Sequence, residues 1–248
     1  EDIMALPKIE TPSYTMVLPS REGEIKFRPF TVKEEKILMM AAETGEQKDM
    51  LRAMSDVIKS CTYDVIICDD LPVFDIEYIF LQLRAKSVGE IAKFKVLCPD
   101  DMKTYTEVEI DLTKVDVHVD DDHNNKVVLD EKRNLGVVFK YPTLNTYDIS
   151  KDIDNINTDD VFNLIHSCVD HIYEGDKIYP GKDSTLKEKK EFFESISQKN
   201  LVDIRKFFDS IPRLKQEIEV ENPKTKVKST VTLRGLQDFF TYASATTI

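Results

Sequence analysis

Apolar and polar residues alternate through the middle of the chain, from Lys93 to Lys140, and no segment of helical spacing separates the alternating runs. A period of two is typical of strands that bury one face. Parallel strands need a long crossover, usually a helix, so strands that follow one another without one are expected to pair antiparallel. The pattern disfavours a parallel α/β fold and predicts an antiparallel region with strands at about 93–97, 104–112, 115–119, 126–129 and 134–140.

On both sides of this region the apolar residues recur at i, i+3 and i+4, as in amphipathic helices. The sequences Thr-Val-Lys-Glu at 31–34 and Thr-Leu-Lys-Glu at 185–188 are capping boxes, which mark helix starts. Helices are expected at about 31–45, 47–61, 75–87 and 159–173, after Thr185, after Ser197 and at 236–243. The first of them carries Ile37, Leu38, Met40 and Ala41 on one side.

Two β-hairpins are predicted near the ends of the chain, at 14–30 and 214–233. The fold class is therefore α+β, with helices flanking an antiparallel sheet region and with N-terminal and C-terminal β-hairpins. The chain divides into 1–92, 93–141 and 142–248. No linker rich in Gly, Ser or Pro separates these parts, so we expect them to pack as one compact unit.

Net charge, hydropathy and cysteine spacing indicate which partners and which compartment to expect. With 34 Lys+Arg against 46 Asp+Glu, the net charge of −12 disfavours nucleic acid as a partner. No apolar run approaches the roughly 20 residues that span a bilayer, so no membrane association is expected. The four cysteines are widely spaced, which indicates reduced thiols in a cytosolic compartment.

The motifs of common enzymes are missing from the sequence. There is no G-x-G-x-x-G, no G-x-S-x-G and no H-E-x-x-H, and Gly181-Lys182 is followed by Asp183 where a phosphate-binding loop needs Ser or Thr. The four histidines are expected at the surface or at helix ends. We therefore predict a protein that is not an enzyme and needs no cofactor.

Three segments resemble parts of metal sites. In the loop that starts at Asp120, the side chains of an EF-hand would be Asp120, Asp122, Asn124 and Glu131, at positions 1, 3, 5 and 12. Strands rather than helices are predicted around this loop, so a solvated acidic loop is favoured over a calcium site. The turns 98–101 and 221–225 have the size of zinc knuckles but supply one thiolate and none, which argues against structural zinc.

Adjacent phenylalanines occur at 192–193, 207–208 and 239–240. Neighbouring rings cannot both point at one narrow stripe of a helix. They indicate either a wide buried face or, less favoured, a groove for a partner.

The segment 25–38, Ile-Lys-Phe-Arg-Pro-Phe-Thr-Val-Lys-Glu-Glu-Lys-Ile-Leu, resembles the opening of the baseplate hub assembly proteins of T4-like contractile-tailed bacteriophages. In that family a hairpin strand ends in Arg-Pro-Phe and a helix begins with Val-Lys-Glu-Glu-Lys. The ending 233–240, Leu-Arg-Gly-Leu-Gln-Asp-Phe-Phe, is similar to that of tail proteins in such phages.

The resemblance implies a non-enzymatic assembly factor or chaperone that binds other baseplate hub proteins transiently in the host cell cytoplasm. A permanent structural subunit of the hub is the alternative, and a calcium-dependent or hydrolytic enzyme built on the acidic loop is a third. The residues predicted to bind the partner form two patches, which are Arg28, Phe30, Lys33, Glu34 and Glu35, and Phe239 and Phe240. For the first patch an equal alternative is structural: Thr31 and Glu34 cap a helix and Phe30 staples it to the core.

Overall fold

The structure, a computed structural model, describes residues 9–146 and 158–235. The helices of these ranges are α1 (Val32–Thr44), α2 (Gln47–Cys61), η1 (Cys68–Asp70), α3 (Val73–Ser87), η2 (Leu112–Lys114), α4 (Thr158–Ser167), α5 (Leu186–Glu194) and α6 (Gln198–Asp209). The strands are β1 (Tyr14–Val17), β2 (Glu24–Phe27), β3 (Ile91–Leu97), β4 (Tyr105–Asp111), β5 (Asp116–His118), β6 (Lys126–Asp130), β7 (Leu135–Phe139), β8 (Val169–Glu174), β9 (Lys177–Pro180), β10 (Arg213–Glu221) and β11 (Lys228–Arg234).

All of the strand pairs are antiparallel, which confirms the predicted α+β class. The strands form two hairpins, β1–β2 and β3–β4, a sheet in the order β11-β10-β5, and a sheet in the order β6-β7-β8-β9. The predicted middle region, 93–141, thus contributes strands to three sheets rather than to one. None of the described helices has both the length and the hydropathy that a membrane-spanning segment needs.

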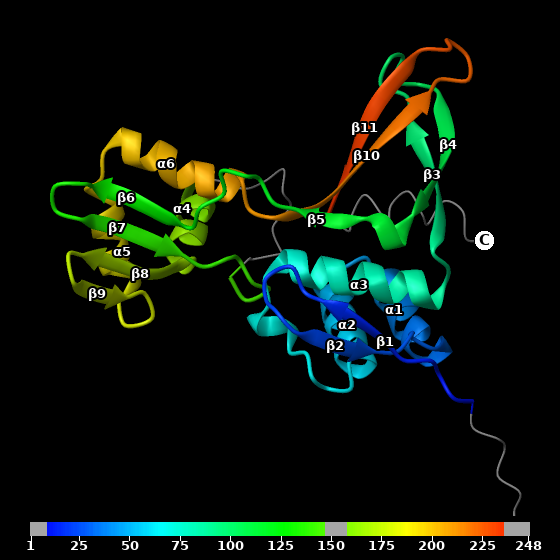
Figure 1. Cartoon of the computed structure of the whole chain (residues 1–248), viewed down its shortest axis with the longest axis horizontal. Helices are drawn as coiled ribbons and strands as arrows, with labels where there is room; N and C mark the ends of the chain where they lie inside the picture. The colour runs from blue at the N-terminus through cyan, green and yellow to red at the C-terminus, as the bar shows by residue number, and fades with distance from the viewer. Residues whose placement is uncertain (1–8, 147–157, 236–248) are drawn as a thin grey trace, which may run out of the picture.

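Two hydrophobic clusters divide the described chain into parts that Figure 1 shows separately. In the helical lobe, α1, α2 and α3 pack with β1 and β2. In the sheet lobe, the four-stranded sheet β6–β9 packs against α4, α5 and α6. The hairpins β3–β4 and β10–β11 project together from the helical lobe and share its cluster; we call them the hairpin arm.

The chain passes between the lobes several times, and His123 connects three of these passages. Its Nδ1 lies 2.8 Å from the Ser210 hydroxyl and its Nε2 lies 2.9 Å from the Tyr141 hydroxyl. The Ser210 hydroxyl also donates to the Lys206 carbonyl at 2.8 Å. With its proton used there, Nδ1–H of His123 would donate to Ser210, and Tyr141 would donate to Nε2. Tyr141 also packs edge-on against Phe74 of α3, with ring centroids 5.1 Å apart, so this cluster joins the two lobes.

The predicted helix at 159–173 is wrong in its second half. Helix α4 ends at Ser167, and Val169–Glu174 is strand β8, which pairs with β7 and with the unpredicted strand β9. A tight turn between β8 and β9 is possible because Gly175 adopts a φ of +59°. The strand pairing satisfies backbone groups on both sides of β8, and it overrides the helical spacing of the apolar residues.

Candidate functional site

The first predicted patch is centred on a buried ion pair. Arg28 Nη2 lies 2.8 Å from Glu34 Oε1, and the Glu34 side chain is only 3% exposed. Ser60 of α2 donates to the same carboxylate oxygen at 3.1 Å and accepts from Arg28 at 3.0 Å. Glu34 Oε2 accepts from the Thr31 amide at 2.8 Å, as the predicted capping box requires. The network therefore ties the end of β2 and the start of α1 to the last turn of α2.

The charges of this network are held by its hydrogen bonds. Burial raises the pKa of the Glu34 carboxyl, but hydrogen bonds from Arg28 and Thr31 outweigh that effect and lower the pKa to about 2. The same hydrogen bond raises the pKa of Arg28. Both groups stay ionised at neutral pH, and they form an ion pair with each other. This geometry favours the structural alternative for Arg28 and Glu34.

Phe30 is also engaged within the fold. It is partly buried and packs against the cluster of the helical lobe. Its amide donates to the Ser87 hydroxyl at 2.8 Å, which fixes the entry of the chain into α1 against the end of α3. Of the five residues predicted in this patch, Lys33 and Glu35 are the two that are exposed.

Helix α1 presents an apolar surface that was not predicted. Its inward line is Glu34, Leu38 and Ala41, while Val32, Met39 and Met40 are 78%, 61% and 58% exposed. Of the four apolar residues grouped on one side of this helix, Ala41 is buried, whereas Ile37 and Met40 are exposed. The buried Glu34 carboxylate takes a place on the inner face that the sequence pattern assigns to apolar residues.

The outward line of α1 mixes apolar and charged residues. A helix turns about 100° per residue, so positions i, i+4, i+7 and i+11 share a face. On α1 these positions are Val32, Lys36, Met39 and Glu43, all of them exposed. Lys33 and Glu35 lie on opposite flanks of this line. We call Val32, Lys33, Glu35, Lys36, Met39 and Met40 the α1 surface.

Two of the three pairs of adjacent phenylalanines lie within the described residues. Phe193 and Phe207 are buried in the cluster of the sheet lobe, and Phe192 and Phe208 pack partly buried against it. These two pairs form the wide buried face that was favoured. Phe239 and Phe240, the second predicted patch, lie outside the described residues.

The four candidate calcium ligands do not converge. Asp120 lies 3.2 Å from His118, and the Asn124 side chain accepts from the Lys126 amide at 2.9 Å. Asp122, Asn124 and Glu131 line an open groove between β6 and α6 that also carries lysines. Nowhere in residues 9–146 and 158–235 do three His, Cys, Asp or Glu side chains come together as a metal site would require. The loop also connects two strands, β5 and β6, and not two helices.

Comparison with known proteins places this geometry in context. The family described as T4 bacteriophage base plate protein matches residues 11–241. The baseplate hub assembly protein gp26 of Enterobacteria phage T4 is 23% identical over 219 residues, which cover 87% of this chain and 92% of that protein. No solved structure matched the chain. Because the family match spans most of the sequence, the chain belongs to the T4 bacteriophage base plate protein family.

Proposed function

We propose that this protein is a non-enzymatic assembly factor that binds other proteins of the baseplate hub transiently while the hub is built. The observation that carries this proposal is the similarity to a baseplate hub assembly protein along 92% of that protein's length. The host cell cytoplasm is the compartment in which such binding would take place.

The α1 surface is the part of the described molecule that we assign to partner binding. Methionine side chains are flexible and polarisable, so they adapt to the shape of a partner. Thirteen residues of helix span about 20 Å, which suits the small interfaces of transient complexes. The charged residues of the α1 surface, Lys33, Glu35 and Lys36, flank the methionines, keep the free protein soluble and add specificity when a partner binds.

A role without covalent chemistry agrees with the serine–histidine pair of the structure, Ser210–His123. In an active nucleophile the serine hydroxyl would give its proton to the histidine. Here the Ser210 hydroxyl donates to the Lys206 carbonyl, and Tyr141 occupies the second nitrogen of His123. These contacts support a structural role for the pair at the joint between the lobes.

A permanent structural subunit of the baseplate is the second candidate. The description of the matched family, a base plate protein, favours it as much as the first. The two candidates differ in what happens after binding: an assembly factor leaves the hub, whereas a subunit stays in the finished particle.

Binding can be tested with the proteins of the hub produced together with this chain and purified through a tag on it. We expect at least one hub protein to co-purify, and expect Met39→Glu/Met40→Glu to reduce that amount at least tenfold. Lys33→Glu should reduce the amount less, because a charge at the rim of an interface mainly affects the rate of association. Val202→Glu on α6 is the matched control, since Val202 is an exposed apolar residue of the other lobe.

The outcomes test the proposed function and the proposed interface separately. If the wild-type chain captures no hub protein, the proposed function is wrong. If the α1 variants bind as well as the wild type while keeping its circular dichroism spectrum, the function can stand but the α1 surface is not the interface.

A further inference from the structure

Two turns of the hairpin arm have the same backbone shape. The first turn, 98–102, reads Cys-Pro-Asp-Asp-Met, and the second, 222–226, reads Asn-Pro-Lys-Thr-Lys. In each turn the amide of the fifth residue donates to the carbonyl of the first, at 3.0 Å and 2.9 Å. The fifth residues, Met102 and Lys226, both have a positive φ, of +52° and +64°. Both turns are thus five-residue knuckles that begin with X-Pro.

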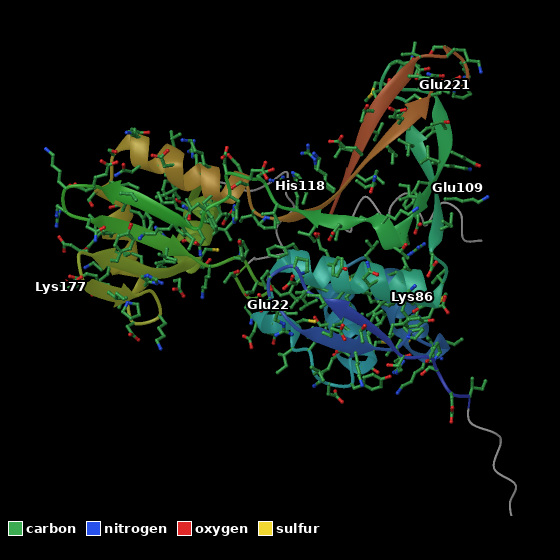
Figure 2. All side chains as sticks on the ribbon, in the orientation of Figure 1. Glu22, Lys86, Glu109, His118, Lys177 and Glu221 are labelled. Atoms are coloured by element: carbon green, nitrogen blue, oxygen red, sulfur yellow. The ribbon has the colours of Figure 1, made fainter. Side chains whose placement is uncertain are left out.

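The two knuckles lie against each other at the far end of the arm. Figure 2 labels Glu221, the residue before the second turn, at this end, beyond Glu109 of β4. Asn222 donates through Nδ2 to both oxygens of Asp100, at 3.0 and 3.1 Å. Thr225 donates through its hydroxyl to Asp100 Oδ2 at 2.5 Å. Through these bonds one carboxylate of the first turn holds both ends of the second.

A structural zinc site built from two knuckles takes its ligands from the first and fourth residues of each, in the pattern C-x-x-C. In this arm those positions are Cys98, Asp101, Asn222 and Thr225. One of the four is a thiol, and it is buried. Zinc needs deprotonated thiolates or imidazoles, so this donor set does not fit it.

The side chains at the same positions serve the turns instead. Asp101 Oδ1 accepts from the amides of Lys103 and Thr104, at 3.0 and 2.9 Å. Asn222 Oδ1 accepts from the amides of Lys224 and Thr225, at 2.9 and 3.3 Å. Each turn is therefore shaped by a side-chain oxygen, and the two turns are joined by charge-assisted hydrogen bonds to Asp100.

We propose that the tip of the hairpin arm is a metal-free counterpart of a two-knuckle zinc site. In place of a metal ion, the hydrogen bonds of Asn222 and Thr225 to the Asp100 carboxylate hold the two turns together. Because these residues are 122 and 125 positions from Asp100 in the chain, the clasp fixes two distant hairpins without a metal or a disulfide. The arm should keep its shape in the presence of chelators and of reductants.

The geometric part of the proposal predicts that a metal site can be restored. The variant Asp101→Cys/Asn222→Cys/Thr225→Cys would place four thiols, with the native Cys98, at the ligand positions. We expect it to bind one Co²⁺ per chain with the visible absorption of a tetrahedral thiolate site, and to release Co²⁺ to Zn²⁺. The matched control, Asp100→Cys/Asn222→Cys/Thr225→Cys, has the same number of thiols with one in the wrong register, and should bind Co²⁺ at least tenfold more weakly.

Two results would overturn this geometry: a variant that binds Co²⁺ no better than its matched control, or a wild-type chain that itself binds Co²⁺ stoichiometrically with a tetrahedral spectrum. The second result would mean that the native residues form a metal site after all.

A second measurement tests the clasp in the native chain and does not depend on the cysteine variants. In Asp100→Asn and in Thr225→Val, we expect the amides of Met102 and Lys226 to exchange hydrogen about tenfold faster than in the wild type, because charge-assisted bonds are among the stronger ones. Treatment of the wild type with EDTA should leave these rates unchanged. Unchanged exchange in both variants, or faster exchange with EDTA alone, would contradict the proposal.

Discussion

Replacement of Glu34 by glutamine should destabilise the protein strongly at neutral pH, although Glu34 was predicted to bind a partner. The substitution keeps the size of the side chain but removes the charge that Arg28, Ser60 and Thr31 are arranged around. Because Glu34 is 3% exposed, water cannot replace the lost interactions. The effect should therefore appear in the isolated chain, without any partner.

The pKa of Glu34 gives the magnitude. It falls from 4.5 to about 2 in the folded protein, and each unit corresponds to about 1.4 kcal/mol of stability in favour of the charged form. The full contribution is thus about 3 kcal/mol. Since Arg28 keeps hydrogen bonds to Ser60 and to the Pro29 carbonyl in the variant, we expect a loss of about 2–3 kcal/mol at pH 7.

The pH dependence has a definite sign. A carboxyl whose pKa is lowered by folding stabilises the protein fully above its unfolded pKa, near 4.5, and loses that contribution as the pH falls towards 2. At pH 3 only about 1.4 kcal/mol of the contribution should remain. Wild type and Glu34→Gln should therefore become more alike in acid.

Urea unfolding followed by circular dichroism at pH 7 and pH 3 measures both effects. Glu35→Gln is the matched control, because Glu35 is the exposed neighbour, and it should change the free energy of unfolding by less than about 0.5 kcal/mol. A loss below 0.5 kcal/mol for Glu34→Gln at pH 7, or an equal loss at both pH values, would refute the structural role of this ion pair.

Three further variants test the sheet lobe and its joint. Phe207→Ala should lower the free energy of unfolding by about 3–5 kcal/mol, because Phe207 is 2% exposed and stacks on Phe139; a loss under 1 kcal/mol in urea unfolding would contradict this packing. Gly136→Ala should lower the melting temperature by several degrees, since its Cβ would lie 2.2 Å from the Tyr173 hydroxyl and 2.6 Å from a backbone oxygen; an unchanged melting temperature would contradict that approach. His123→Phe keeps the stacking but loses two hydrogen bonds, at a cost of about 1–3 kcal/mol. Burial lowers the pKa of His123, so the wild type should lose stability below about pH 6.5, where the unfolded chain takes up the proton, and the variant should lose less; equal acid sensitivity in melting curves would argue against a neutral His123.

Much of the secondary structure could be predicted from the sequence, because most segments carry one unambiguous period. Helix α2 has the predicted bounds, and the two terminal hairpins lie where they were expected. The segment 169–174 fits two periods at once: Cys168 and Ile172 continue the helical stripe, while Val169, His171 and Tyr173 alternate like a strand. Pairing with β7 decides between them, and that contact is not local.

The candidate site was harder to predict, for two physical reasons. The pattern of apolar residues predicts that Glu34, a charged residue, points outward. Its ion pair with Arg28 allows it to be buried instead, and Met39 and Met40 then lie on the exposed side of the helix. The clasp at Asp100 depends on a contact 122 residues away, and neither turn alone indicates that the other lies beside it.

The central claim is that this chain assembles the baseplate hub and then leaves it. A quantitative mass-spectrometric count of the protein in purified phage particles and in lysates of infected cells tests it most directly. We expect the protein in the lysate, bound to hub proteins, and fewer than one copy per finished particle. A whole-number copy count in the particle, equal to that of known hub components, would contradict this account and make the protein a permanent subunit of the baseplate.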